Sequence, residues 1–189
     1  MISKSLIVFM LLSILSANAS AGDWVIDKAS SHVKFSAKQT GTLFTGSFSR
    51  FAVRVSFDPA HPENGSIAAK IDMTSVNAGD KQRNTALPGK EWFDSGVFPA
   101  ADFTSSSISQ TCDGTYIAHG TLTLHGVTKP ISLPFSFVEN DGQAKVTANL
   151  SLNRSDFNVG SGAWATGKWV SLEVSVEISI TAERPGKNQ

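Results

Sequence analysis

The chain has 189 residues, with 16 basic and 16 acidic side chains and a single cysteine, Cys112. This length suits one domain with a sizeable hydrophobic core. The balanced charge argues against nucleic-acid binding, which needs a basic surface. One cysteine excludes an internal disulfide, and we interpret Cys112 as an incidental thiol in a turn.

The first residues predict export from the cytoplasm. Lys4 precedes an apolar run over residues 6–15, and Ala17-Asn18-Ala19 forms a small-x-small cleavage site. These features are typical of a secretory signal peptide, which we place at residues 1–19, with cleavage after residue 21 as the alternative. The apolar run is about half of the roughly 20 residues that span a bilayer. We therefore expect an exported protein without stable membrane insertion.

The remainder, expected to be one domain over residues 22–184, is dominated by alternating apolar and polar side chains. Seven runs follow this pattern: residues 33–37, 51–57, 67–73, 118–124, 131–137, 146–152 and 172–180. A period of two indicates strands with one dry face and one wet face, usually paired antiparallel. The sequence therefore predicts an all-β domain of about eight strands.

Turn dipeptides separate these runs. Asn64-Gly65, Asp113-Gly114 and Asp141-Gly142 each lie between alternating segments, and His125-Gly126 lies between Leu124 and Val127. Asn-Gly and Asp-Gly pairs tolerate the positive φ angles of tight hairpins. We therefore predict turns at all four places.

Pro130 directly precedes the alternating run over residues 131–137, and Pro134 lies within it. A proline has no N–H to donate to a neighbouring strand. We therefore expect this strand either to carry a bulge or to lie where the sheet closes imperfectly.

The segment over residues 76–98 breaks the alternating pattern. Asp80 is a good N-cap, and Pro88-Gly89 would end a helix. We predict one or two short helices here, crossing the sheet or closing one of its ends. The strands themselves suit either a sandwich or a barrel, and periodicity does not decide between them.

Four segments, in order along the chain, carry a family resemblance. They are Trp24-x-Ile26-Asp27 with Ser31-His32-Val33-x-Phe35 and Gly46-x-Phe48; Asp80 through Leu87 with Trp92-Phe93-Asp94 and Phe98-Pro99-x-x-x-Phe103; Gly120 through Pro130; and Asn153-Arg154-x-Asp156-Phe157-x-x-Gly160, running to Val170. Together they resemble the YceI-like family of bacterial periplasmic polyisoprenoid-binding proteins.

The resemblance implies an eight-stranded antiparallel lipocalin-like barrel that encloses a long prenyl chain. Gln39 stands where members of that family often have a histidine. The segment from Val159 to Trp164 resembles a branch often found beside membrane b-type cytochromes. For this branch the resemblance implies an isoprenoid quinone as an alternative ligand and such a cytochrome as a partner.

No catalytic or metal-binding motif accompanies these features. The histidines His32, His61, His119 and His125 have no metal-ligand spacing, and no cysteine joins them. Ser151 and Ser155 lie near Asp156 without a histidine placed to complete a triad. We expect no enzyme activity, no cofactor and no metal.

The candidate ligand-binding residues come from the dry strand faces and from the aromatic-rich irregular stretches, which would lie at a barrel mouth. They are Phe35, Phe48, Trp92, Phe93, Phe98, Phe103, Leu122, Phe135, Leu150, Arg154, Asp156, Phe157, Trp164 and Trp169. The alternative for the aromatic residues is an ordinary filled core.

Arg154 and Asp156 share the dry face of the strand over residues 146–152 if that strand continues without a bulge. Two charges there must pair with each other or meet the polar head of a lipid. The resemblance implies a periplasmic carrier for a polyisoprenoid lipid or isoprenoid quinone. The alternative is a periplasmic adaptor or stress-related interaction protein with a filled core and no lipid.

Overall fold

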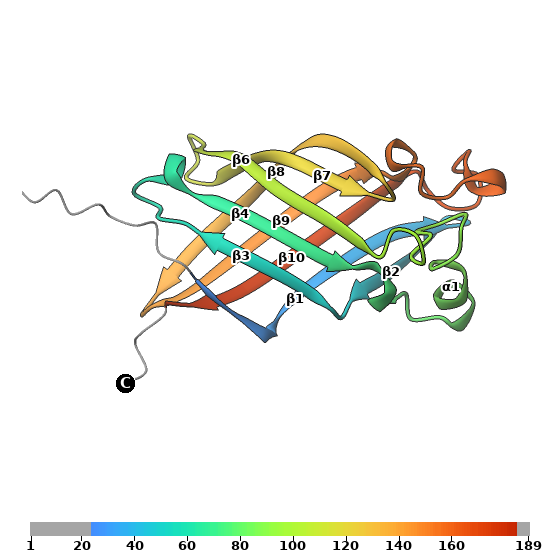
Figure 1. Ribbon diagram of the computed structural model, residues 1–189, viewed down its shortest axis with the longest axis horizontal. Helices are drawn as coiled ribbons and strands as arrows, with labels where there is room; N and C mark the ends of the chain where they lie inside the picture. Colours follow the sequence, from blue (N-terminus) through green and yellow to red (C-terminus); the bar gives the residue numbers. More distant parts are fainter. Residues whose placement is uncertain (1–23, 185–189) are drawn as a thin grey trace, which may run out of the picture.

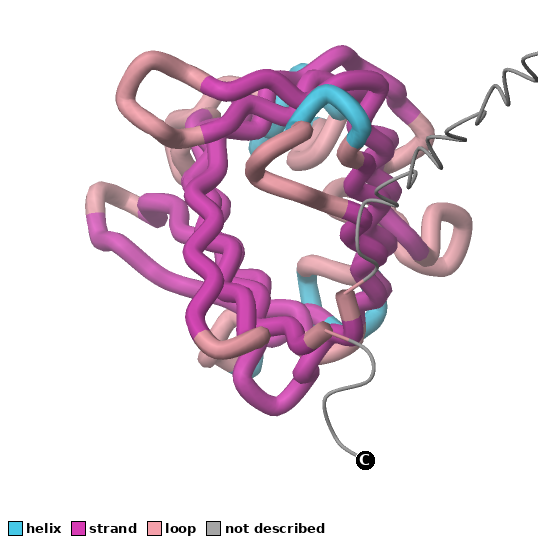
Figure 2. The backbone as a smooth tube through the Cα atoms, turned by 90° about the vertical axis from the view of Figure 1, so that its left-hand side faces the viewer, coloured by secondary structure: helices cyan, strands magenta, loops and turns pink. Residues whose placement is uncertain are grey.

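The computed structural model describes residues 24–184, which form one antiparallel sheet of ten strands (Figure 1). The predicted signal peptide at residues 1–19 lies outside the described residues. Neighbouring strands follow the order β3-β4-β6-β7-β8-β9-β10-β1-β2-β5. The sheet is strongly curled, so that its backbone surrounds a central space when viewed from one end (Figure 2).

The strands are β1 (Val25–Gln39), β2 (Thr42–Phe48), β3 (Phe51–Ser56), β4 (Ser66–Asp72), β5 (Val76–Asn77), β6 (Ala100–Gln110), β7 (Tyr116–Leu124), β8 (Val127–Asn140), β9 (Gln143–Asn153) and β10 (Glu173–Glu183). The helices are α1 (Lys81–Ala86) and the 3-10 turns η1 (Pro62–Asn64), η2 (Met73–Ser75), η3 (Arg154–Phe157) and η4 (Gly162–Trp164).

The all-β prediction is confirmed, but the expected number of eight strands is wrong. Three strands, β2, β5 and β6, were not predicted because they show no clear alternation of apolar and polar residues. Strand β5 has only two residues, β6 is rich in serine, and β2 carries Gly46 at an inward position. The strand order also has two edges, β3 and β5, in place of the closed eight-stranded ladder. The curl brings the edge strand β3 beside the start of β1, where the Trp24 N–H donates to the Val55 carbonyl at 3.1 Å.

The tight turns agree with the sequence at three of the four places. His125-Gly126 and Asp141-Gly142 both have positive φ angles, and each joins two strands directly. Asp113-Gly114 lies in the turn between β6 and β7, with Gly114 at φ 83°. Asn64-Gly65 is not a tight hairpin, because Asn64 ends η1 and Gly65 has φ −77°.

Strand β8 runs straight through its two prolines without a bulge. Its ladder with β7 is continuous from Val127 to Phe135, whereas its ladder with β9 begins only at Phe135, opposite Ala148. The first half of β8 therefore has a strand partner on one side only. This confirms the predicted place of imperfect closure and excludes the alternative of a bulge.

The irregular segments gather at one end of the curled sheet, called here the loop end. It consists of residues 78–99, which include α1, and residues 154–172 (Figure 1). The predicted helix forms, and the Asp80 carboxylate caps it by accepting from the Arg83 N–H at 3.0 Å. The opposite end, called the terminal end, holds the β6–β7 and β8–β9 turns and both ends of the described chain.

Candidate functional site

The interior of the sheet holds a cavity of about 220 Å³. Every strand except β5 contributes side chains to its wall, together with residues from the loop end. All of the lining residues are apolar except Arg154. The alternation seen in the sequence builds this wall, because every second residue of a strand points to the same face of the sheet.

The inward side chains are not fully packed against one another. Leu122, Leu150, Val174 and Ile178 face the cavity, yet each remains only half-buried. In a filled core of this size, large apolar residues at such central positions become fully buried. The middle of the molecule is therefore a hollow with apolar walls.

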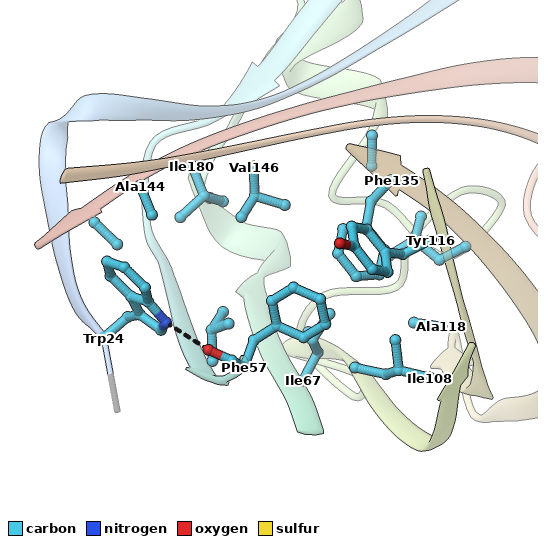
Figure 3. Packing of buried hydrophobic residues seen from close by; sticks show 14 of the residues in the cluster. Trp24, Phe57, Ile67, Ile108, Tyr116, Ala118, Phe135, Ala144, Val146 and Ile180 are labelled. Carbon is cyan, nitrogen blue, oxygen red and sulfur yellow. Dashed lines mark hydrogen bonds between the residues drawn. The ribbon is translucent and has the colours of Figure 1, made fainter. Parts of the chain in front are cut away.

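An aromatic cluster closes the cavity at the terminal end (Figure 3). Phe57 is 1% exposed, and its ring centroid lies 4.9 Å from Tyr116, 5.5 Å from Phe135 and 4.9 Å from Phe137. The Trp24 indole N–H donates to the Phe57 carbonyl at 3.1 Å. These contacts are edge-to-face ring pairs, a favourable geometry, and they pack aromatic side chains into the terminal end of the interior.

A second row of rings crosses the loop end. Phe35 lies 5.5 Å from Phe48, and Phe48 lies 6.0 Å from Phe93, measured between ring centroids. Gly46 is required beside this row, because a Cβ atom there would lie 2.2 Å from the Phe35 ring. The row joins β1 and β2 to the loop that follows α1.

Arg154 fastens the long loop between β9 and β10. Its side chain is 4% exposed and donates to five backbone carbonyls: those of Ser171, Val159, Gly160, Trp164 and Val170. A guanidinium group has five N–H donors, so all of them are used. Its flat face also lies 5.2 Å from the Trp92 ring centroid. Burial lowers the pKa of Arg154 from its ordinary value.

This arrangement corrects the expected pairing of Arg154 with Asp156. Strand β9 ends at Asn153, and the 3-10 turn η3 then buries Arg154 and turns Asp156 to solvent. The two residues therefore do not share a dry face. Because all five of its N–H donors are occupied by backbone carbonyls, Arg154 has no N–H left to donate to a lipid head.

Ten of the fourteen candidate residues surround the cavity: Phe35, Phe48, Trp92, Phe93, Phe103, Leu122, Phe135, Leu150, Arg154 and Phe157. The other four, Phe98, Asp156, Trp164 and Trp169, are not part of its wall. The sequence reasoning missed Phe44, Val159 and Val170, which come from an unpredicted strand and from a loop. Contact with a ligand stays a prediction for all of them.

The tryptophans outside the wall brace the loop end from its surface. Trp164 packs on Trp92 at 5.5 Å between centroids and donates from Nε1 to the Glu91 carboxylate at 3.0 Å. Trp169 is 46% exposed, and the Lys168 ammonium lies 5.0 Å from its centroid. Neither residue is part of the cavity wall, and their expected position at a mouth of the barrel stays a prediction.

The four histidines lie apart from one another. His32 lies 3.0 Å from Glu177, His61 lies 3.6 Å from Glu63, His119 contacts Ser132 at 2.9 Å, and His125 contacts the Phe157 carbonyl at 3.2 Å. Within residues 24–184, no three histidine, cysteine or acidic side chains are grouped as metal ligands. No helix of the described part is long and apolar enough to cross a membrane.

Comparison with known proteins decides the family. A family model described as the YceI-like domain matches residues 24–182. The chain belongs to the YceI-like family. A UPF0312 protein of Pseudomonas savastanoi pv. phaseolicola is 33% identical to this YceI-like protein, over 94% of this chain and 97% of the relative. A UPF0312 protein of Yersinia enterocolitica is 32% identical, over 88% and 91% respectively.

Solved structures share the fold. The crystal structure of Burkholderia cenocepacia BcnA is 34% identical, with a TM-score of 0.81 over 83% of this chain and 99% of that chain. A polyisoprenoid binding domain from Saccharophagus degradans, implicated in plant cell wall breakdown, is 19% identical with a TM-score of 0.67. That likeness covers 87% of this chain and 99% of that chain, and at this identity it shows the fold alone.

Proposed function

We propose that this YceI-like protein is a periplasmic, non-catalytic carrier that encloses a polyisoprenoid lipid or isoprenoid quinone in its cavity. The observation that carries the proposal is the wall of the cavity, where every side chain is apolar except Arg154 and the donors of Arg154 are all used by backbone carbonyls. Such a wall suits a hydrocarbon chain and offers nothing that would bind a polar molecule or activate a reactive group.

The energetics favour a long apolar ligand. Each buried methylene contributes about 0.8 kcal/mol, so one isoprene unit contributes roughly 3–4 kcal/mol when it leaves water. A few units supply nanomolar affinity even after the cost of ordering a flexible chain is subtracted. The polar head therefore needs no buried partner, in keeping with the absence of a free polar side chain in the wall.

One comparison and one feature of the cavity support the same class of ligand. The Saccharophagus degradans domain is described as polyisoprenoid-binding, and it shares this fold. The aromatic clusters at both ends of the cavity leave the half-buried aliphatic residues between them as the surface that a chain would cover. An isoprenoid quinone and a polyisoprenoid lipid differ in their heads, but both present a prenyl chain to this surface.

Native mass spectrometry after mild purification tests the proposal. We expect the wild-type protein to carry an adduct of isoprenoid mass that is released on denaturation. Leu150→Trp fills the cavity from its wall and should remove the adduct, because Leu150 points inward from β9. Ser151→Trp is the matched control, since Ser151 is the exposed neighbour on the outer face.

A wild-type protein that carries no lipid, and that takes up none from vesicles containing polyprenol or quinone, would contradict the carrier. The filled-core adaptor would then be the better description. Export is a separate part of the proposal and has its own measurement. N-terminal sequencing of the protein from a periplasmic extract should begin at Ser20 or Gly22, and retention of Met1 in a membrane fraction would contradict it.

A further inference from the structure

In one part of the wall, the consecutive strands β8 and β9 are not joined to each other by backbone hydrogen bonds. Residues 127–134 of β8 pair only with β7, and residues 149–153 of β9 pair only with β10. The two segments face each other beyond the point where the β8–β9 ladder stops, at Phe135 and Ala148. We call this place the β8–β9 seam.

The prolines explain why the ladder stops there. The ladder between β8 and β7 is uninterrupted at Pro130 and Pro134. Because a proline has no N–H to donate, the nitrogens of both prolines must point away from β7. Residues four apart in a strand have the same backbone direction. Both missing N–H groups therefore fall on the side that faces β9, and the ladder cannot extend across the seam.

The seam opens directly onto the cavity. Ile131 and Leu133 on the β8 side and Leu150 and Leu152 on the β9 side all line the cavity. The wall here consists of these hydrophobic side chains, without the backbone hydrogen bonds that join β8 to β9 from Phe135 onward. Apolar side chains change rotamer far more readily than a ladder of hydrogen bonds opens.

Solvent reaches the inner face at the loop end of the seam. Lys129 lies on the same face of β8 as Ile131 and Leu133, and its partner across β7 is the cavity-lining Leu122. Lys129 is nevertheless exposed. Just beyond it, His125 Nδ1 lies 3.2 Å from the Phe157 carbonyl oxygen and joins the β7–β8 turn to the chain after β9. The seam is thus bounded at both of its ends.

The other routes into the cavity are less suitable. The terminal end is occupied by the aromatic cluster around Phe57, and the loop end by the row of rings from Phe35 to Phe93 and by Arg154 with its five carbonyl partners, called here the Arg154 clamp. The edge strand β3 also approaches the start of β1, where the Trp24 N–H donates to the Val55 carbonyl, but residues 25–32 of β1 contribute nothing to the cavity wall. A chain passing between β1 and β3 would therefore have to displace Trp24 and Ile26, which pack into the cluster around Phe57.

We propose that the β8–β9 seam is the portal through which an isoprenoid chain enters and leaves the cavity sideways, with its polar head remaining outside beside Lys129. This inference rests on the proposed function. Passage through the side of the wall needs only displacement of the four aliphatic side chains, and it leaves the two aromatic ends and the Arg154 clamp in place.

Reversible cross-linking tests the portal. Ser132→Cys and Ser151→Cys place thiols on the exposed outer face of the two seam segments, in a Cys112→Ser background, and a short thiol-cleavable bis-maleimide bridges them. The probe is a polyprenol labelled with an anthraniloyl fluorophore in phosphatidylcholine vesicles. We expect bridging to slow uptake at least ten-fold, and cleavage of the bridge to restore it.

The matched control places the same bridge across the other approach of strands. Ala29→Cys on β1 and Ala52→Cys on β3 are both exposed, and bridging them should change uptake less than two-fold. An unchanged uptake rate in the seam-bridged protein overturns the portal, and so does an equal slowing by the control bridge. A wild-type protein that takes up no probe at all contradicts the carrier function instead.

A second variant is designed to close the seam without a cross-linking reagent. Pro130→Thr with Pro134→Thr restores both backbone donors and should slow uptake at least three-fold, with equilibrium binding of the probe unchanged. Pro62→Ala, in η1 at the terminal end, is the control and should leave uptake unchanged. Faster uptake by the double threonine variant would overturn the portal.

Discussion

At the scale of single residues, Arg154 illustrates how a buried charge can be stabilised without a counter-ion. Its guanidinium group meets five carbonyl dipoles from the loop between β9 and β10, and these oxygens would otherwise be buried without donors. An unsatisfied buried polar group costs about 1–3 kcal/mol. The side chain and the loop therefore depend on each other.

We expect Arg154→Met to lower the free energy of unfolding by about 3–5 kcal/mol, because several carbonyls lose their donors at once. Urea unfolding followed by tryptophan fluorescence measures the change. Arg54→Met is the control, since Arg54 is exposed on the outer face of β3 and should change stability by less than about 0.5 kcal/mol. Equal effects of the two substitutions would contradict the clamp.

Gly160 is needed by the same clamp. It has φ +81°, and a Cβ atom there would lie 2.0 Å from Arg154 Nη1. Gly160→Ala should lower the melting temperature more than Gly114→Ala, which has a similar φ of +83° but no atom within 4 Å of its Cβ position. The control isolates backbone strain, about 1–3 kcal/mol, from the steric effect on Arg154. Calorimetry of both variants measures the difference.

At the scale of elements, the β6–β7 turn depends on one carboxylate. The hydroxyls of Thr111 and Thr115 and the Thr115 backbone N–H donate to Asp113 and lower its pKa from 3.8 to about 2. A lowered folded-state pKa means that the carboxylate stabilises the turn fully above about pH 4, the ordinary aspartate value. That contribution is lost as the pH falls towards 2.

We therefore expect the Asp113 carboxyl signal in an NMR titration to change with an inflection near pH 2. The amides of residues 111–115 should lose protection over the same range, relative to their intrinsic exchange rates. In Asp113→Asn this pH dependence should vanish. An inflection at the ordinary aspartate value would show that the three donors do not hold the carboxylate.

The elements also show what a sequence can and cannot predict here. Long alternating runs such as residues 172–180 predicted their strands and their dry faces, because the pleat imposes a period of two. Strand β6 was not predicted, since its serines give no apolar contrast, although Phe103 and Ile108 still point inward. The predicted inward position of Asp156 was wrong because β9 ends at Asn153 and the chain continues as the 3-10 turn η3. The alternation of apolar and polar residues does not indicate where a strand gives way to such a turn.

At the scale of the whole molecule, the residues of the cavity wall are of two kinds: those buried in an aromatic cluster and those that remain half-buried beside the hollow. Phe135 illustrates the first kind: it is 4% exposed and stacks on Tyr116 at 5.4 Å between centroids. Phe135→Ala should cost about 3–5 kcal/mol in urea unfolding, with or without lipid, because it opens the aromatic cluster that closes the terminal end. A cost below about 1 kcal/mol would mean that this cluster is not a rigid closure.

Leu122 illustrates the second kind, because it is half-buried and faces the hollow middle of the molecule. In a filled core, Leu122→Trp would overpack and cost about 1–3 kcal/mol. Here the indole has space, so we expect a cost below about 1 kcal/mol in the lipid-free protein, together with loss of bound isoprenoid.

Thr121→Trp, on the exposed outer face of β7, is the control and should retain the lipid. Unfolding of the lipid-free variants and native mass spectrometry of the same preparations separate the two cases. A full overpacking cost with no lipid in the wild type would mean that side chains fill the cavity, and the interior would then serve stability alone.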